Sequence, residues 1–358
     1  MQHALGLASK ARGRTSPNPL VGALIVKNEQ IIGEGYHQKA GSNHAEVNAL
    51  NMAGLEARGA KMYVTLEPCS HQGRTPPCVD AIINAGIEEV IIATLDPNPQ
   101  VMGQGIRKLN AAGITTKVGV LENAALRLNE IFCKYITTKI PFVFMKYAMT
   151  LDGKIATSIG DSQWISSEDS RKLVHYWRNS YDAILVGIGT VLADNPTLNT
   201  RLDILDKKNP IRIILDDKLA MPLNSNIVNT SLEQETIIFT AKNYDKNKAN
   251  VLREKGLKII GVSGGLKQLD LKEVLERLGE LNITSVLVEG GANVNASFIE
   301  NRLVDKISAF VAPKIVGGIA PSPITGQGVK LMQDAHTFND VEVETIADDV
   351  LITLYTGW

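Results

Sequence analysis

The chain is short of the features that mark secreted, membrane-bound and nucleic-acid-binding proteins. It has only three cysteines in 358 residues, too few for a disulfide framework and consistent with a reducing compartment. No apolar run is long enough to cross a bilayer, and the first residues do not have the pattern of a signal peptide. The net charge of −1 disfavours a nucleic-acid partner. We therefore expect a soluble, cytoplasmic protein without a membrane or nucleic-acid partner.

The length suggests two domains, and both halves alternate strand and helix patterns, which is typical of the α/β class. In the first half the patterns predict strands at 21–26, 30–35, 61–66, 90–93 and 118–120. Helices are predicted at 44–53, 78–84 and 123–138. Pro141 ends the last of these helices, and a new strand follows at once. The expected domains are therefore residues 1–139 and 140–358.

The second half is expected to contain a longer series of strands, with helices between several of them. These strands are predicted at 142–148, 183–187, 211–215, 236–240, 257–262, 285–289 and 306–312, with two more within 341–355. The first contains Lys146 among apolar residues. If Lys146 faces inward, it needs an anionic partner, because an unpaired buried ammonium group is costly. In the alternative, its side chain extends to water from the edge of the sheet.

The first half contains one imidazole and two thiols at positions that suit a catalytic metal. His44, Cys69 and Cys78 can bind zinc through three protein ligands and leave the fourth tetrahedral position for water. Zinc lowers the pKa of such a water to about 7. Glu46 follows His44 by two residues, so both can reach one pocket from the start of a helix and Glu46 can move protons. This pattern is typical of zinc-dependent nucleobase deaminases.

The spacing of the two cysteines departs from that pattern. Eight residues separate Cys69 from Cys78, where the usual motif has two. A loop of this length can return to the metal if Pro76 and Pro77 lead into a helix that begins near Cys78. The alternatives are a structural zinc knuckle or two unrelated thiols. A knuckle needs a fourth ligand, and the remaining cysteine, Cys133, lies far along the chain.

Two glycine-rich junctions in the second half suggest a nucleotide site. Gly187 and Gly189 follow one apolar strand, and Gly290 and Gly291 follow another; each junction leads into a predicted helix. Such a turn can present backbone N–H groups to a phosphate, although either one alone is more often just a tight turn. Together with Asp194 just past the first junction, they favour a dinucleotide that bridges both. Ser162, Arg178 and Arg201 are candidates for a phosphate-binding group.

The sequence resembles one family along nearly its whole length, the bifunctional deaminase–reductases of riboflavin biosynthesis. The resemblance is carried by SPNPLVG at 16–22, GYH at 35–37, HAEV at 44–47, TLEPCSHQGRTPPC at 65–78, DPNP at 96–99, TLDGKIA at 150–156, SQWIS at 162–166, VLADNPTLNTR at 191–201 and VEGGA at 288–292. It implies a cytidine-deaminase-like three-layer α/β/α domain followed by a dihydrofolate-reductase-like α/β domain. The implied cofactors are Zn²⁺ and NADPH.

The implied chemistry has two steps on one small molecule. Zinc-dependent hydrolysis removes the 2-amino group of 2,5-diamino-6-(5-phosphoribosylamino)pyrimidin-4-one, and NADPH then reduces the ribosyl side chain to ribityl. A homo-oligomer is also expected. The resemblance assigns His44, Cys69 and Cys78 to zinc and Glu46 to proton transfer.

The resemblance also assigns the remaining site residues. In the deaminase domain the substrate-binding residues are Asn18, His37, His71, Arg74 and Asn98. In the reductase domain Lys146 and Asp194 are polar groups near the hydride transfer. NADPH would contact Ala148, Trp164, Thr190, Asp194, Gly291, Ala292, Asn293, Val294, Asn295, Ala296 and Ser297. The second substrate would contact Ser162, Arg178, Leu198, Arg201 and Glu289.

One position departs from the family pattern, because Asp217 stands where the family often has serine. An acidic side chain near the adenosine 2′-phosphate would repel it and weaken the preference for NADPH over NADH. Two other interpretations remain open. A deaminase with a regulatory second domain would not bind a nicotinamide nucleotide, and a zinc-stabilised binding module would leave Glu46 without a role.

Overall fold

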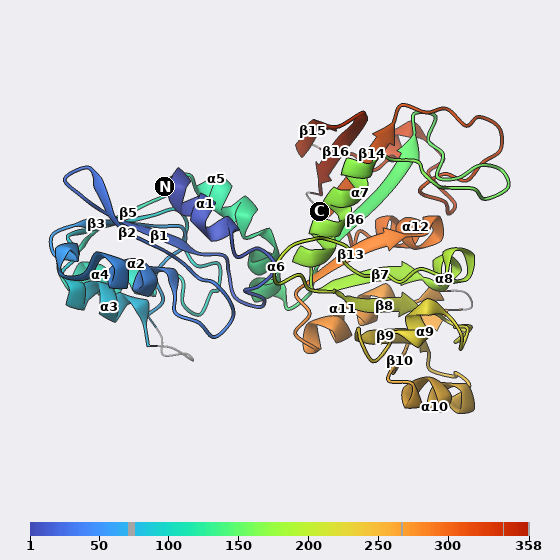
Figure 1. The fold of residues 1–358 in the computed structure, drawn as a ribbon, viewed down its shortest axis with the longest axis horizontal. Helices are drawn as coiled ribbons and strands as arrows, with labels where there is room; N and C mark the ends of the chain where they lie inside the picture. The colour runs from blue at the N-terminus through green and yellow to red at the C-terminus, as the bar shows by residue number, and fades with distance from the viewer. Residues whose placement is uncertain (71–75, 266–267, 339, 357–358) are drawn as a thin grey trace. The chain divides into compact units, whose positions relative to one another are not determined.

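The chain folds into two compact units, Met1–Ile140 and Pro141–Trp358 (Figure 1). The structure is a computed structural model, and it describes residues 1–70, 76–265, 268–338 and 340–356. The boundary lies one residue from the expected position, where Pro141 follows the end of a helix. No helix within these described ranges combines the length and apolar character needed to cross a lipid bilayer.

The first unit is built on a five-stranded sheet with the order β2-β1-β3-β4-β5. Strand β1 is antiparallel to β2 and β3, whereas β3, β4 and β5 are parallel. Its elements are α1 (Gln2–Ser9), β1 (Gly22–Lys27), β2 (Gln30–Tyr36), α2 (Ala45–Ala53), η1 (Gly54–Ala57), β3 (Lys61–Val64), α3 (Cys78–Ala85), β4 (Glu89–Ile92), α4 (Gln104–Ala111), β5 (Thr115–Val118), α5 (Glu122–Leu128) and α6 (Glu130–Thr138).

Helices cover both faces of this sheet, because side chains alternate along each strand. Ala23 and Ile25 of β1 pack into a core with α2, α3 and α4, while Leu24 between them packs against α1 on the other face. The expected three-layer α/β/α arrangement is therefore confirmed. Gly35 of β2 allows α2 to lie close to the sheet, since a Cβ there would overlap the carbonyl oxygen of Ala45.

The structure corrects three sequence-based expectations in this unit. The helix expected at 123–138 is two helices, α5 and α6, that meet at the buried Asn129. The Asn129 side chain bonds both the N–H and the carbonyl oxygen of Leu20, a tertiary contact that local periodicity does not reveal. The strand expected at 118–120 is β5, which begins earlier, at Thr115. Helices α1 and α4 were not predicted.

The second unit is built on a nine-stranded sheet with the order β10-β9-β8-β7-β13-β6-β14-β16-β15. Strands β6 to β10, β13 and β14 pair in parallel, and β15 and β16 are antiparallel. Its elements are β6 (Phe142–Thr150), α7 (Glu168–Ser180), β7 (Ala183–Gly187), α8 (Ile188–Asp194), β8 (Ile211–Leu215), α9 (Asn226–Asn229), β9 (Thr236–Ala241), α10 (Lys246–Glu254), β10 (Lys258–Val262), β11 (Gly264–Gly265), β12 (Gln268–Leu269), α11 (Leu271–Glu280), β13 (Ser285–Gly290), α12 (Ala292–Glu300), β14 (Lys306–Ala312), η2 (Met332–Asp334), β15 (Asp340–Ile346) and β16 (Asp349–Tyr355).

The expected strands of this unit are all present, and the sheet order places three of their carboxyl ends side by side. β13 lies between β7 and β6 in the sheet, and all three run in the same direction. Ligands of open parallel sheets bind at the carboxyl ends of the strands. Gly187 and Gly290 end two of these strands, so the two glycine junctions meet at this edge.

Candidate active sites

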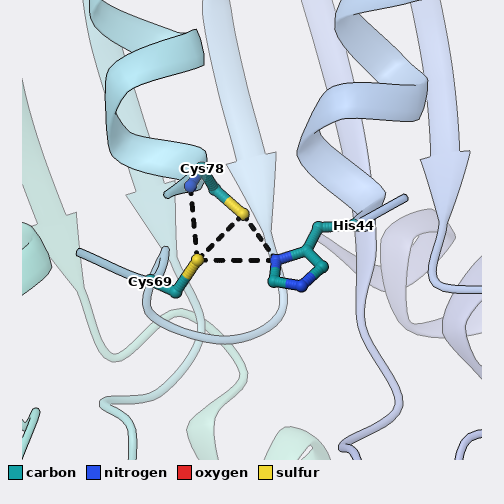
Figure 2. Close-up of side chains that lie close together, drawn as sticks. All are labelled: His44, Cys69 and Cys78. Carbon is teal, nitrogen blue, oxygen red and sulfur yellow. Dashed lines mark hydrogen bonds between the residues drawn. The ribbon is translucent and has the colours of Figure 1, made fainter. Parts of the chain in front are cut away.

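His44, Cys69 and Cys78 converge in the first unit to form a candidate metal site (Figure 2). His44 is the residue before α2, Cys78 is the first residue of α3, and Cys69 lies in the segment that follows β3. The Nδ1 atom of His44 lies 2.7 Å from the Cys78 Sγ and 3.5 Å from the Cys69 Sγ. The two sulfur atoms are 3.2 Å apart. The long spacing between the cysteines therefore does not prevent them from sharing a metal.

Glu46 points into the same site from the first turn of α2. Its side chain is buried, and its Oε2 makes no hydrogen bond to any described atom. Burial disfavours the charged carboxylate and raises the pKa of Glu46 to about 7. With His44 and Cys69 it lines a cavity of about 410 Å³. A soft donor set with a non-ligand carboxylate beside it suits a catalytic zinc ion.

Three of the five substrate-binding residues expected in this unit line the same cavity: Asn18, His37 and Asn98. The His37 Nε2 lies 3.2 Å from the Asn18 amide nitrogen, and its Nδ1 lies 3.1 Å from the carbonyl oxygen of Asn43. The ring is therefore neutral, with its proton on Nδ1 and an acceptor toward Asn18. His71 and Arg74 lie outside the described residues.

Sequence reasoning missed the role of Glu67 beside this cavity. Its buried carboxylate accepts hydrogen bonds from the backbone N–H groups of Asp96, Gly103 and Gly105 at 3.2, 2.9 and 2.9 Å. These bonds fix the loop that carries Asn98. An acidic residue at the end of a buried strand was the available signal, because a buried carboxylate needs donors.

The two glycine junctions of the second unit are linked directly. The Gly291 N–H donates to Thr190 Oγ1 at 3.1 Å, which joins the start of α12 to α8. A cavity of about 1120 Å³ is lined by Gly187 and Gly189 of the first junction and by residues of α12, the helix that follows the second junction. Of the expected cofactor-binding residues, this cavity is lined by Asn293, Val294, Ala296 and Ser297. Its size suits a dinucleotide, and it lies at the carboxyl ends of the strands.

A second cavity of about 300 Å³ lies at the same edge of the sheet. It is lined by the expected residues Lys146, Ala148, Ser162, Trp164, Arg178, Arg201, Glu289, Gly291, Ala292 and Asn295. Asn295, in the first turns of α12, lies in the wall of this cavity. Its Oδ1 is buried without a hydrogen-bond partner among the described residues. An unpaired buried carbonyl oxygen is suited to accept from an amide of a bound ligand.

Lys146 faces inward and has an anionic partner. Strand β6 is in the middle of the sheet, so the alternative of a lysine at a sheet edge is wrong. The Lys146 Nζ lies 3.6 Å from the Glu289 carboxylate, and burial lowers the pKa of Lys146 although Glu289 opposes this shift. Arg178 donates two hydrogen bonds to Glu289 at 2.6 and 2.8 Å. Arg178 is therefore held against a carboxylate, and these bonds use two of the five N–H groups of its guanidinium.

Three residues expected at the reductase site, Thr190, Asp194 and Leu198, line neither cavity of the second unit. Asp194 is exposed at the last position of α8, where partial burial raises its pKa. Leu198 is buried in the core beside β7 and β8, so any contact with a ligand would have to come from its backbone. Sequence reasoning placed them by their motif, and a motif does not fix side-chain direction.

The fold and the two sites define a bifunctional protein, with a zinc-dependent deaminase unit and a nucleotide-binding reductase unit. Residues 1–94 match the cytidine and deoxycytidylate deaminase zinc-binding region, and residues 141–352 match the RibD C-terminal domain. The riboflavin biosynthesis protein RibD of Aquifex aeolicus is 46% identical, over 98% of this chain and 96% of its own.

Solved structures agree with these matches. An Acinetobacter baumannii RibD superposes with a TM-score of 0.88 at 37% identity, covering 99% of this chain and 97% of its own. A Thermotoga maritima diaminohydroxyphosphoribosylaminopyrimidine deaminase/5-amino-6-(5-phosphoribosylamino)uracil reductase gives 0.86 at 39% identity, with the same coverage. The chain belongs to the RibD family. It is a deaminase and NADPH-dependent reductase of riboflavin biosynthesis, and its second unit has the dihydrofolate-reductase-like fold of that family.

Proposed function

We propose that the first unit deaminates 2,5-diamino-6-(5-phosphoribosylamino)pyrimidin-4-one and that the second reduces the ribosyl side chain of the product. We assign the deamination to the expected domain 1–139 and the reduction to the expected domain 140–358. The observation that carries the deaminase part of the proposal is the cluster of His44, Cys69 and Cys78 beside Glu46, whose buried Oε2 has no hydrogen-bond partner among the described residues. The reductase part of the proposal is supported by the cationic cavity of about 300 Å³ and the dinucleotide-sized cavity at the same edge of the sheet.

In the deaminase site each residue has a defined task. Zinc held by His44, Cys69 and Cys78 supplies the Lewis acidity that makes water nucleophilic at neutral pH. Glu46 accepts the proton of the attacking water and returns a proton to the leaving amine. Asn18 and His37 offer polar groups to the pyrimidine, and Asn98 is held in place through Glu67. His71 and Arg74 complete the set that the family resemblance assigns.

In the reductase site NADPH supplies the hydride that reduces C1′ of the ribosyl group. We assign Ala148, Trp164, Thr190, Asp194 and residues 291–297 to NADPH. Ser162, Arg178, Leu198, Arg201 and Glu289 are assigned to the substrate. Lys146 lines this cavity and burial lowers its pKa, so it is our main candidate for proton donation at the sugar. Asp194 remains a second candidate.

The function is tested by incubating the purified zinc-loaded protein with the diaminopyrimidine, with and without NADPH. Without NADPH we expect ammonia and the deaminated, still ribosyl-bearing pyrimidine. With NADPH we expect the ribityl product and one NADPH consumed per molecule. Mass analysis distinguishes these products. Ammonia release without any oxidation of NADPH would instead support the alternative of a deaminase with a regulatory second domain.

Asp217 is expected to reduce the preference for NADPH over NADH. It lies just past β8 and lines the cavity of about 1120 Å³, at the end of the strand next to the Gly187 junction. An acidic residue in this place binds a ribose 2′-hydroxyl and repels a 2′-phosphate. We predict that Asp217→Ser raises the ratio of kcat/KM for NADPH to that for NADH by about tenfold. Because salt screens exposed charges, the gain should shrink at high ionic strength. An unchanged ratio would show that the adenosine end of the cofactor binds away from Asp217.

We infer that two copies of the chain associate through the exposed face of β15 and β16. In these strands Val341 and Val343 share a face with Ile352 and Leu354, while the acidic residues of β15 lie on the opposite face. Val341 is 50% exposed and Val343 67% exposed. Such strict alternation is typical of a sheet with one covered face. Sedimentation is expected to show a dimer or larger oligomer that Val343→Glu dissociates; a monomeric wild-type protein would contradict this.

We also infer a cytoplasmic location. Cys69, Cys78 and Cys133 form no disulfide with one another. Zinc thiolates and free thiols are stable in a reducing compartment. Fractionation of cells that produce the protein is expected to place its activity in the cytosol, and recovery from an oxidising compartment would contradict this.

A further inference from the structure

The cavity of about 300 Å³ in the second unit is built for an anion. Its described lining contains four cationic side chains, Lys146, Arg171, Arg178 and Arg201, and one acidic side chain, Glu289. The lining therefore carries an excess of positive charge, which favours a phosphate-bearing ligand. This argument rests on the proposed reductase function, in which the substrate of this cavity carries a ribosyl phosphate.

Most of these cations are already engaged by neighbouring groups. Arg178 bonds Glu289 through two nitrogens and the carbonyl oxygen of Asn199 through the third. Arg171 donates to the carbonyl oxygen of Ser166 at 2.6 Å and lies over the Trp164 ring. Lys146 faces Glu289. Arg201 is the exception, because its exposed side chain makes one hydrogen bond to the described residues, and that bond goes to the imidazole of His175.

The contact between Arg201 and His175 cannot consist of two good hydrogen bonds. The backbone N–H of Arg201 lies 3.1 Å from His175 Nδ1, and the side-chain Nε–H lies 3.2 Å from His175 Nε2. A neutral imidazole accepts at one nitrogen only, and an imidazolium accepts at neither. The backbone N–H is held in place by the chain, so Nδ1 is the acceptor and Nε2 carries the proton. The Nε2–H of His175 therefore faces the Nε–H of Arg201, and two donors meet without an acceptor.

The surroundings keep His175 neutral. Its side chain is buried on α7, which lowers its pKa to about 4 together with the nearby positive charges of Arg178 and Arg201. Lys146 acts in the same direction and Glu289 opposes it. An oxygen acceptor placed between His175 and Arg201 would satisfy both donors. A phosphate group supplies such oxygens.

We propose that His175 is a substrate-binding residue of the reductase site, whose Nε2–H donates to the substrate phosphate beside Arg201. In the free protein the Arg201 guanidinium rests against the imidazole, and it moves onto the phosphate when the substrate binds. His175 Nδ1 keeps the Arg201 backbone in place throughout. The phosphate group therefore binds to Arg201 and His175, while Arg178 orients Glu289.

The proposal is tested with His175→Asn in the full-length, zinc-loaded protein. Asparagine can keep an acceptor for the Arg201 backbone N–H but has no donor at the position of Nε2. With saturating NADPH we expect the KM for 5-amino-6-(5-phosphoribosylamino)uracil to rise about tenfold to a hundredfold, as for a lost hydrogen bond to a charged group. The kcat should stay within about twofold, since the phosphate is bound equally in the ground and transition states. For the dephosphorylated ribosyl compound, KM should not change.

The matched control is Lys172→Gln, which removes an exposed cation from the same helix outside the cavity. It should leave the KM of both compounds unchanged. An equal rise of KM for both compounds in His175→Asn would show a merely structural role and overturn the proposal, as would an unchanged KM for the phosphorylated compound. If the wild-type protein oxidised NADPH with neither compound, the proposed function itself would be contradicted.

A second measurement does not depend on the variant folding. In the wild-type protein labelled with ¹⁵N-histidine, we expect one ring with a protonated Nε2 and an unprotonated Nδ1 that stays neutral to about pH 5. Titration with inorganic phosphate should shift the Nε2–H signal of this ring. The opposite tautomer, or a signal that phosphate does not move, would overturn the proposal.

Discussion

Glu46→Gln is expected to abolish deamination while zinc stays bound. The amide keeps the shape of the side chain but cannot accept the proton of the attacking water. Removal of a general acid–base group costs about 10² to 10⁴ in rate, and Glu46 serves more than one proton transfer, so the loss should reach the upper end or exceed it. Ammonia release and zinc content, measured on the same sample, give the result.

Cys78→Ala serves as the comparison, because it removes a ligand and not the proton-transfer group. It should lose both metal and deamination, since only two protein ligands remain. NADPH oxidation with the deaminated pyrimidine should persist in both variants, because the reductase site lies in the other unit. If Glu46→Gln lost its zinc, or turned over at a near-normal rate, Glu46 would not be the proton-transfer residue.

Glu289→Gln is expected to have the largest effect on the second unit. The carboxylate is buried between Arg178 and Lys146, with 8% of its side chain exposed. Without its charge two buried cations lose their partner, and breaking a buried ion pair in this way costs about 3–5 kcal/mol. All three tryptophans lie in the second unit, so urea unfolding followed by tryptophan fluorescence reports on this unit. NADPH oxidation should be lost as well.

The control for this variant is Glu235→Gln, at an exposed ion pair with Lys258 in the same sheet. The Lys258 Nζ and the Glu235 Oε1 are 2.6 Å apart, but the side chains of Lys258 and Glu235 are 59% and 45% exposed. Water screens such a pair, and its loss should cost at most about 1 kcal/mol. Equal effects of the two substitutions would contradict the role assigned to Glu289.

The same carboxylate predicts how the second unit responds to acid. Burial alone would raise the pKa of Glu289, but the charges of Arg178 and Lys146 and the hydrogen bonds from Arg178 outweigh it and hold the pKa at about 2. Because this value lies below the usual 4.5, the stabilising contribution is complete above the usual pKa and is lost as the pH falls from about 4.5 toward about 2. The wild-type protein should lose stability in this range more steeply than Glu289→Gln does.

The residue types of the metal site could be predicted from the sequence, because the chemistry dictates them. A catalytic zinc ion needs soft donors and an open position, and a hydrolytic deaminase needs a nearby carboxylate. His44, Cys69, Cys78 and Glu46 meet these requirements, and the structure brings them together. The glycine junctions were predictable in the same way, since a turn at the end of a buried strand has a local signature.

The strands were also predictable, because a buried parallel strand is a short apolar run whatever its neighbours are. The first and last residues of the helices and strands were harder to predict. The break between α5 and α6 depends on Asn129, whose partner Leu20 is more than a hundred residues away in sequence. The polar strand β5 forms because β4 offers it a parallel edge to pair with, which its own sequence does not show.

The amino-acid sequence alone thus determined the two-domain α/β organisation, the zinc ligands, Glu46 and the family resemblance, because each depends on local pattern or on residue chemistry. Only the tertiary structure decided which ionisable groups face one another. It paired Glu289 with Arg178 and Lys146, placed Asp194 outside both cavities, and put His175 against Arg201. These contacts join segments that are distant in sequence, so their geometry follows from how the strands and helices pack and not from any one segment.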